Sequence, residues 1–126
     1  MTPSNLRTTA HDPVLLDHGA LEEVRGMMKD KFSEVLGYFL EDSAMYVQQI
    51  VEGFAGGKAE AVVLPAHTLK SSAKQMGAMR LWDCSQVLEL TVREIVKGSG
   101  DLSQIAPLVS QIQNVFKETH NAYRSY

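Results

Sequence analysis

The chain has 126 residues, of which 44% are apolar and 21% charged, with a net charge of -3. This size and balance fit one compact domain and disfavour nucleic acid as a partner, because no Lys/Arg-rich stripe with interleaved aromatic residues is present. The lone cysteine excludes an internal disulfide, and no apolar run is long enough for a membrane span or a secretory leader, so we expect a cytoplasmic protein.

The N-terminal part of the chain divides into a leader and a short helix. Residues 1–12 are polar and aperiodic, which predicts a flexible leader before one domain over residues 13–126. From Pro13 to about Met28, apolar residues recur with helical spacing. We therefore expect a short first helix ahead of the main helices.

Two stronger helical patterns follow, joined by glycines. Apolar residues recur every three or four positions from Phe32 to Phe54, and Gly56-Gly57 then ends this long helix and reverses the chain. The next helix runs back antiparallel and ends at Gly77. It carries His67.

Two more helices complete the pattern. One runs from Met79 to about Lys97, and the last is capped by Asp101 or Ser103, with Pro107 in or near its first turn. No stretch alternates polar and apolar residues as a strand would. We predict an all-α fold: an antiparallel up-down four-helix bundle with an additional short N-terminal helix.

The predicted helix places His67 on its outer face. At roughly 100° per residue, the apolar stripe centres about 140° away from His67. The stripe consists of Val62, Ala66, Leu69, Ala73 and Met76. An exposed imidazole is equally consistent with an ordinary surface histidine. Its neighbours favour a chemical role, because Lys70, Ser71 and Lys74 lie on the same side of the helix.

Val63 and Leu64 lie one turn before His67, also on the exposed side by the angular count. An apolar patch beside a cationic, nucleophilic centre is typical of a protein-docking surface, to which Ser71 and Lys74 would also belong. The alternative is burial of both aliphatic residues under the Gly56-Gly57 turn.

Other candidate sites have simpler interpretations. His11, His18 and His120 lack metal-ligand spacing, so we predict no metal site. Cys84 lies on an apolar stripe and is expected to be buried, and Trp82 is expected to contribute packing rather than a binding platform.

The segment around His67 resembles a known motif. Ala66-His67-Thr68-Leu69-Lys70-x-Ser72, followed by Gly77-Ala78, resembles the core of histidine-containing phosphotransfer (HPt) domains of bacterial two-component phosphorelays. The resemblance covers about residues 13–120. Flanking segments that share it are Pro13-Val14-Leu15 through Phe32, Phe39-Leu40-Glu41-Asp42-Ser43 and Leu81-x-x-Cys84-x-x-x-Leu88-Glu89.

The resemblance implies a phosphorelay intermediate. His67 would accept a phosphoryl group on a ring nitrogen and exchange it with the aspartate of a receiver domain, Lys70 would steady the phosphate, and Ser71, Lys74 and Gly77 would support the site. The implied partners are response-regulator receiver domains and a hybrid sensor histidine kinase, with Mg²⁺ on the receiver and no cofactor on this chain. The protein would be a monomeric phosphocarrier without ATP-dependent kinase activity of its own, since the sequence has no glycine-rich nucleotide loop.

Two residues depart from the family pattern. Ser71 stands where the family usually has glycine, so its side chain crowds the approach to the imidazole or hydrogen-bonds there. Pro65 lies inside the predicted helix, and we expect a bend or break between about Ala61 and Pro65.

Two alternatives stay open from the sequence. One is a helical adaptor that binds a signalling partner through the surface around Val63, Leu64 and His67 without phosphate chemistry. The other is a module that works like the phosphoacceptor domain of chemotaxis kinases.

Overall fold

The computed structural model describes residues 13–126, so the leader expected over residues 1–12 lies outside the described part of the chain. Within residues 13–126 the secondary structure is entirely helical. In chain order the elements are α1 (His18–Met28), the 3-10 helix η2 (Lys29–Lys31), α2 (Phe32–Ala55), α3 (Glu60–Gln75), α4 (Met79–Val96), the 3-10 helix η3 (Leu102–Ile105) and α5 (Ala106–Tyr123).

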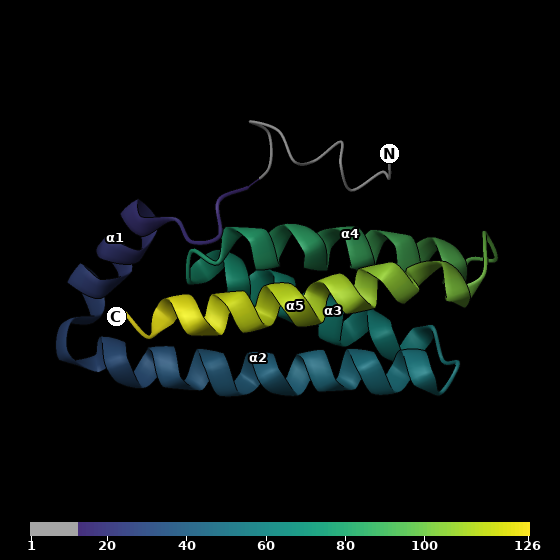
Figure 1. The fold of residues 1–126 in the computed structure, drawn as a ribbon, viewed down its shortest axis with the longest axis horizontal. Coiled ribbons are helices and arrows are strands. Elements are labelled where there is room, and N and C mark those ends of the chain that lie inside the picture. The colour runs from purple at the N-terminus through teal and green to yellow at the C-terminus, as the bar shows by residue number, and fades with distance from the viewer. Residues whose placement is uncertain (1–12) are drawn as a thin grey trace.

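The four long helices form the bundle that the sequence predicts. Helices α2 and α4 do not pack face to face; each of them packs against both α3 and α5. In Figure 1, α2 and α4 form the two edges, with α5 in front and α3 behind it. The short helix α1 lies at the end of the bundle near the C-terminus and contacts α2. The extra N-terminal helix is therefore confirmed.

The helix ends follow the glycines, with some shifts from expectation. Gly57 and Gly77 both have φ of 70°, a left-handed conformation that side chains other than glycine adopt at a cost. The first helix starts at His18 rather than near Pro13, because the side chain of Asp17 accepts the backbone N–H of Ala20 and caps it there.

The start of the last helix also differs from the prediction. Asp101 caps η3, where its side chain accepts the N–H of Ser103 and the side chain of Gln104 accepts the N–H of Asp101 in return. Helix α5 begins only at Ala106, with Pro107 in its first turn as expected. A 3-10 turn thus absorbs the capping residues before the α-helix starts.

The expected break near Pro65 is wrong. Helix α3 runs without interruption from Glu60 to Gln75 and contains Pro65 in its second turn, where the ring is buried. The proline removes one hydrogen bond to the carbonyl of Ala61, and burial of its apolar ring offsets part of that loss. His67 therefore stands on a continuous helix.

The C-terminal end of α3 is tied to two other parts of the fold. The Tyr123 hydroxyl donates to the Met76 carbonyl at 2.5 Å, and burial raises the pKa of Tyr123 above its usual value. The Asp17 N–H donates to the Gly77 carbonyl at 2.8 Å. A Cβ on Gly77 would lie 3.1 Å from the Asp17 carbonyl oxygen, so a larger residue here would have to push that backbone away. These contacts fix the axial position of the helix that carries His67.

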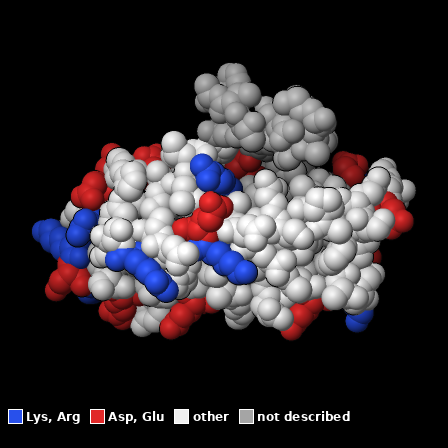
Figure 2. All heavy atoms as spheres, viewed as in Figure 1, with Lys and Arg blue, Asp and Glu red and all other residues white. Residues whose placement is uncertain are grey.

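The surface shows how charge is distributed on the face that carries α5. Basic and acidic side chains are scattered there among larger uncharged areas (Figure 2). None of the helices in residues 13–126 combines the length and apolar character needed to cross a bilayer.

Candidate functional site

His67 projects from α3 into solvent, as its angular position predicts. Its side chain is 48% exposed, whereas Ala66 and Leu69 on the opposite side of the helix are fully buried. Because these two neighbours are packed in the core, the direction of the imidazole is set by the helix itself. An incoming group can therefore reach the ring from outside the bundle.

Glu89 on α4 holds one nitrogen of this ring. Its side chain is only 5% exposed, and its Oε2 lies 3.0 Å from Nδ1 of His67. An ionised carboxylate can only accept hydrogen bonds, so Nδ1 carries the proton and donates it to Glu89. The lone pair of the imidazole is then on Nε2, the nitrogen that does not contact Glu89.

Two cations hold the same carboxylate. Lys70 Nζ lies 2.8 Å from Oε1 of Glu89, while Arg93 places Nε at 2.8 Å and Nη2 at 2.7 Å from Oε2. Burial alone would raise the pKa of Glu89, but its hydrogen bonds from Lys70, Arg93 and His67 outweigh burial and lower that pKa to about 2. Glu89 is therefore ionised at neutral pH and accepts from Nδ1 of His67.

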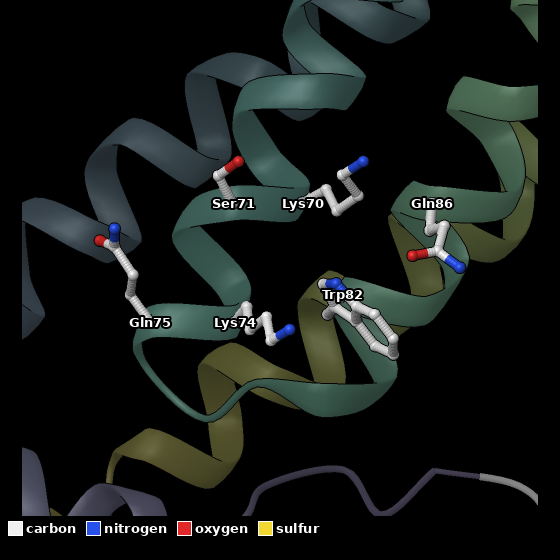
Figure 3. Close-up of a pocket in the computed structure, with 6 residues that line it drawn as sticks. All are labelled: Lys70, Ser71, Lys74, Gln75, Trp82 and Gln86. Atoms are coloured by element: carbon white, nitrogen blue, oxygen red, sulfur yellow. The ribbon is translucent and has the colours of Figure 1, made fainter.

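A hollow of about 560 Å³ lies beside this cluster, on the side towards the C-terminus of α3. Figure 3 shows Lys74 reaching from α3 towards the ring of Trp82 on α4, and the two lie 5.5 Å apart, from Nζ to ring centroid. The lining residues are Lys70, Ser71, Lys74, Gln75, Trp82 and Gln86. The ring of Trp82 packs partly on the core, as expected, but it also forms one wall of the hollow, which the sequence did not indicate.

The predicted aliphatic patch is divided by the structure. Leu64 is 70% exposed, one turn before His67, whereas Val63 is half-buried and packs against the core. Val63 also lines a second hollow of about 440 Å³, together with Arg93 and other residues of α3 and α4. Leu64 is thus not buried under the Gly56-Gly57 turn, whereas Val63 is half-buried against the core. The two hollows lie on either side of the His67–Glu89 pair along the α3–α4 groove.

Comparison with known proteins places this chain in a family. A protein-family model described as "Hpt domain" matches residues 34–122. The chain belongs to the Hpt family. Its members are histidine phosphotransfer proteins of phosphorelays.

A solved structure with the same fold supports the architecture of this Hpt chain. It is the histidine-containing phosphotransfer protein B (HptB) from Pseudomonas aeruginosa PAO1, with a TM-score of 0.80 and 24% sequence identity over 88% of this chain and 92% of that one. No curated protein sequence matches the chain. At this level of identity, the likeness to HptB concerns the fold.

The remaining candidate residues of the Hpt chain lie away from His67. His18 stacks on Tyr126 and hydrogen-bonds its hydroxyl, and His120 lies edge-on to Phe116, while His11 is outside the described residues. Cys84 is buried, as predicted. Among residues 13–126, no three His, Cys, Asp or Glu side chains are grouped so that they could hold a metal ion.

Sequence reasoning missed the polar half of the site. Glu89 directly follows Leu88 and lies three residues before Val92, both fully buried, yet periodicity alone assigns no role to Glu89 or Arg93. An acidic residue at the edge of an apolar helical stripe is a signal for a buried carboxylate with a partner. Arg93 lies four positions on along the same helix, a spacing at which an acid and a base can pair, so this part of the cluster has a signal in the sequence. His67 lies 22 positions away on another helix, so spacing along the chain could not identify that partner.

Proposed function

We propose that His67 is the phosphoacceptor of this Hpt chain and exchanges a phosphoryl group with the aspartate of response-regulator receiver domains. The observation that carries the proposal is the exposed ring whose Nδ1 is held by the buried Glu89, with Nε2 left as the nucleophile. Family membership supports it, because Hpt domains transfer phosphoryl groups through a histidine.

Each bond and proton of the transfer step can be followed with the groups present. The Nε2 lone pair forms a bond to phosphorus while the bond between phosphorus and the aspartyl oxygen breaks, and that electron pair leaves with the partner's carboxylate. The proton on Nδ1 stays in place, so the phosphorylated ring carries a positive charge. Glu89 lies beside that charge and stabilises it. In the reverse direction the same groups release the phosphoryl group to the receiver.

Lys70 and Lys74 would offset the charge on the phosphoryl oxygens. Lys70 is one helical turn from His67 and now pairs with Glu89, so its ammonium must turn or be shared to meet the phosphoryl group. Lys74 lies a further turn away, over Trp82. The Mg²⁺ that assists the transfer would be bound by the receiver domain rather than by this chain.

This chain would act as a carrier between proteins rather than as a kinase. We propose a hybrid sensor histidine kinase and receiver domains as its partners, and a monomer as the working form. Leu64 and Ser71 are exposed on either side of His67 and would lie within the surface that a receiver covers, next to Lys74 and Val63.

Transfer of the phosphoryl group from phosphorylated receiver domains to this chain tests the proposal. Receiver domains from the same genome, phosphorylated with acetyl phosphate and Mg²⁺, are mixed with the wild type, His67→Gln and His120→Gln. We expect acid-labile, base-stable label on the wild type and on His120→Gln, and none on His67→Gln. His120 is the matched control because it is a partly exposed histidine on another helix of the same bundle.

The same experiment distinguishes a phosphocarrier from an adaptor. An adaptor would bind a receiver domain equally well with and without His67, and neither its wild type nor its variants would take up label. Label that survives in His67→Gln would contradict the assignment of His67.

A further inference from the structure

Arg93 is the cation that the proposed chemistry does not use, yet it makes the shortest contact in the cluster. Its Nε and Nη2 lie 2.8 and 2.7 Å from Oε2 of Glu89, the same oxygen that accepts from Nδ1 of His67. Two N–H groups of one guanidinium on one carboxylate give directional, charge-assisted bonds. The Arg93 side chain itself is 47% exposed and does not fill the core.

The two cations hold opposite oxygens of Glu89. Lys70 binds Oε1 and Arg93 binds Oε2, so the plane of the carboxylate is set between them. If Arg93 is removed, Lys70 is the one cation among the described residues that still contacts Glu89. The carboxylate is then free to turn towards Lys70, which weakens the hydrogen bond that fixes the proton on Nδ1.

A second consequence concerns the phosphorylated state. When Lys70 turns to the phosphoryl group, Glu89 loses one of its two counter-ions while its side chain remains buried. A buried carboxylate is strongly unfavourable unless cations contact it. Arg93 stays bound to Oε2 next to the positively charged phosphorylated ring, so Glu89 keeps a fixed ion pair when Lys70 leaves.

We propose that Arg93 is a positioning residue for the chemistry of His67: it keeps Oε2 of Glu89 on Nδ1 and remains as the counter-ion of Glu89 when Lys70 moves to the phosphoryl group. This inference rests on the proposed function of His67. It assigns Arg93 no contact with the phosphoryl group, because Arg93 acts through Glu89.

The test compares Arg93→Gln, Arg93→Lys and the wild type, with Lys97→Gln as the matched control. Lys97 lies one turn further along the same side of the α3–α4 groove, carries the same charge and contacts Glu94 instead of Glu89. Two properties are measured in each protein: the ¹⁵N chemical shifts of the His67 ring, which report where its proton lies, and the site-resolved rate of phosphorylation by phosphoramidate. His120 in the same molecule is the internal reference for that rate.

For Arg93→Gln we expect a smaller share of the Nδ1–H form and a rate at His67 about tenfold lower, the factor that corresponds to loss of one charge-assisted hydrogen bond. Arg93→Lys should recover part of both changes, and Lys97→Gln should match the wild type. If Arg93 had a purely structural role, Arg93→Gln would change neither the ring ¹⁵N shifts nor the ratio of the His67 rate to the His120 rate.

The outcomes separate the two proposals. Wild-type shifts and rate in Arg93→Gln, no recovery in Arg93→Lys, or an equal loss in Lys97→Gln would overturn the role of Arg93 and leave His67 as the acceptor. A wild-type His67 that reacts no faster than His120 would contradict the proposed function itself, whatever the ring shifts in the Arg93 variants show.

Discussion

The imidazole of His67 and the carboxylate of Glu89 come from neighbouring helices and meet at 3.0 Å, with the carboxylate buried in the α3–α4 interface and the ring half in solvent. This relationship gives the two ring nitrogens different surroundings. Nδ1 faces a fixed acceptor inside the protein, and Nε2 remains for chemistry outside it.

Replacing Glu89 by Gln should remove the preference for one ring proton position. A carboxamide can donate to or accept from Nδ1, so both neutral forms of the imidazole become populated. We expect phosphorylation of His67 to slow by about tenfold, as for loss of one hydrogen bond to a charged group. Ring ¹⁵N shifts and the rate of label uptake measure this. Glu94→Gln, an exposed change on the same helix, should leave both at wild-type values, and an equal effect there would contradict the role of Glu89.

Acid should weaken the fold in part through Glu89. Because its pKa falls from 4.5 to about 2 in the folded protein, the folded state binds this proton more weakly than the unfolded state. The stabilisation of the folded state by ionised Glu89 is complete above pH about 4.5 and is lost as the pH falls through about 2. Urea unfolding of the wild type and Glu89→Gln across this range should therefore show a difference in unfolding free energy that narrows with acid. A difference independent of pH would contradict the ion-pair cluster.

Lys70→Ala should shorten the lifetime of the phosphorylated protein. The variant removes the cation nearest to His67 along the helix, while Arg93 still compensates Glu89, so the fold should persist. We expect hydrolysis of the phosphohistidine to accelerate by about tenfold, the size of one charge-assisted interaction. The loss of phosphoryl label from the protein, followed after the phosphoryl donor is removed, measures this rate. Lys58→Ala, in the turn between α2 and α3, serves as the control, and equal decay in all three proteins would remove Lys70 from the mechanism.

Ser71→Gly should speed transfer from a receiver domain at a small cost in stability. Ser71 is exposed one turn from His67 and lines the larger hollow, and glycine there would leave a partner more room. Glycine within a helix costs about 0.5 kcal/mol relative to serine. Ser110→Gly on α5 carries the same helix penalty far from the site. A transfer rate equal to that of the wild type would show that the serine is neutral at this position.

The sequence predicted what periodicity controls. The apolar stripe of α3 placed His67 outside the bundle, and the glycines at positions 57 and 77 marked the helix ends. The sequence did not predict that His67 would meet Glu89, because that contact depends on the axial register of α3 against α4. That register is set by how the buried faces of α3 and α4 pack against each other across the short connection of residues 76–78.

Pro65 shows a second limit. Its chemistry correctly predicts a lost backbone hydrogen bond, but burial of the ring in the bundle keeps α3 continuous. Local rules describe the isolated helix, and tertiary packing decided the outcome. The double role of Trp82, in the core and in the wall of the hollow, likewise depends on how α3 and α4 pack.

The most direct test of the account is to identify the phosphorylated atom. ¹⁵N-labelled protein is phosphorylated by a charged receiver domain, and the nitrogen bonded to phosphorus is assigned by ¹⁵N and ³¹P NMR. We predict a single phosphoryl group on Nε2 of His67, with the proton retained on Nδ1. A phosphoryl group on Nδ1, or on any other residue, would contradict it.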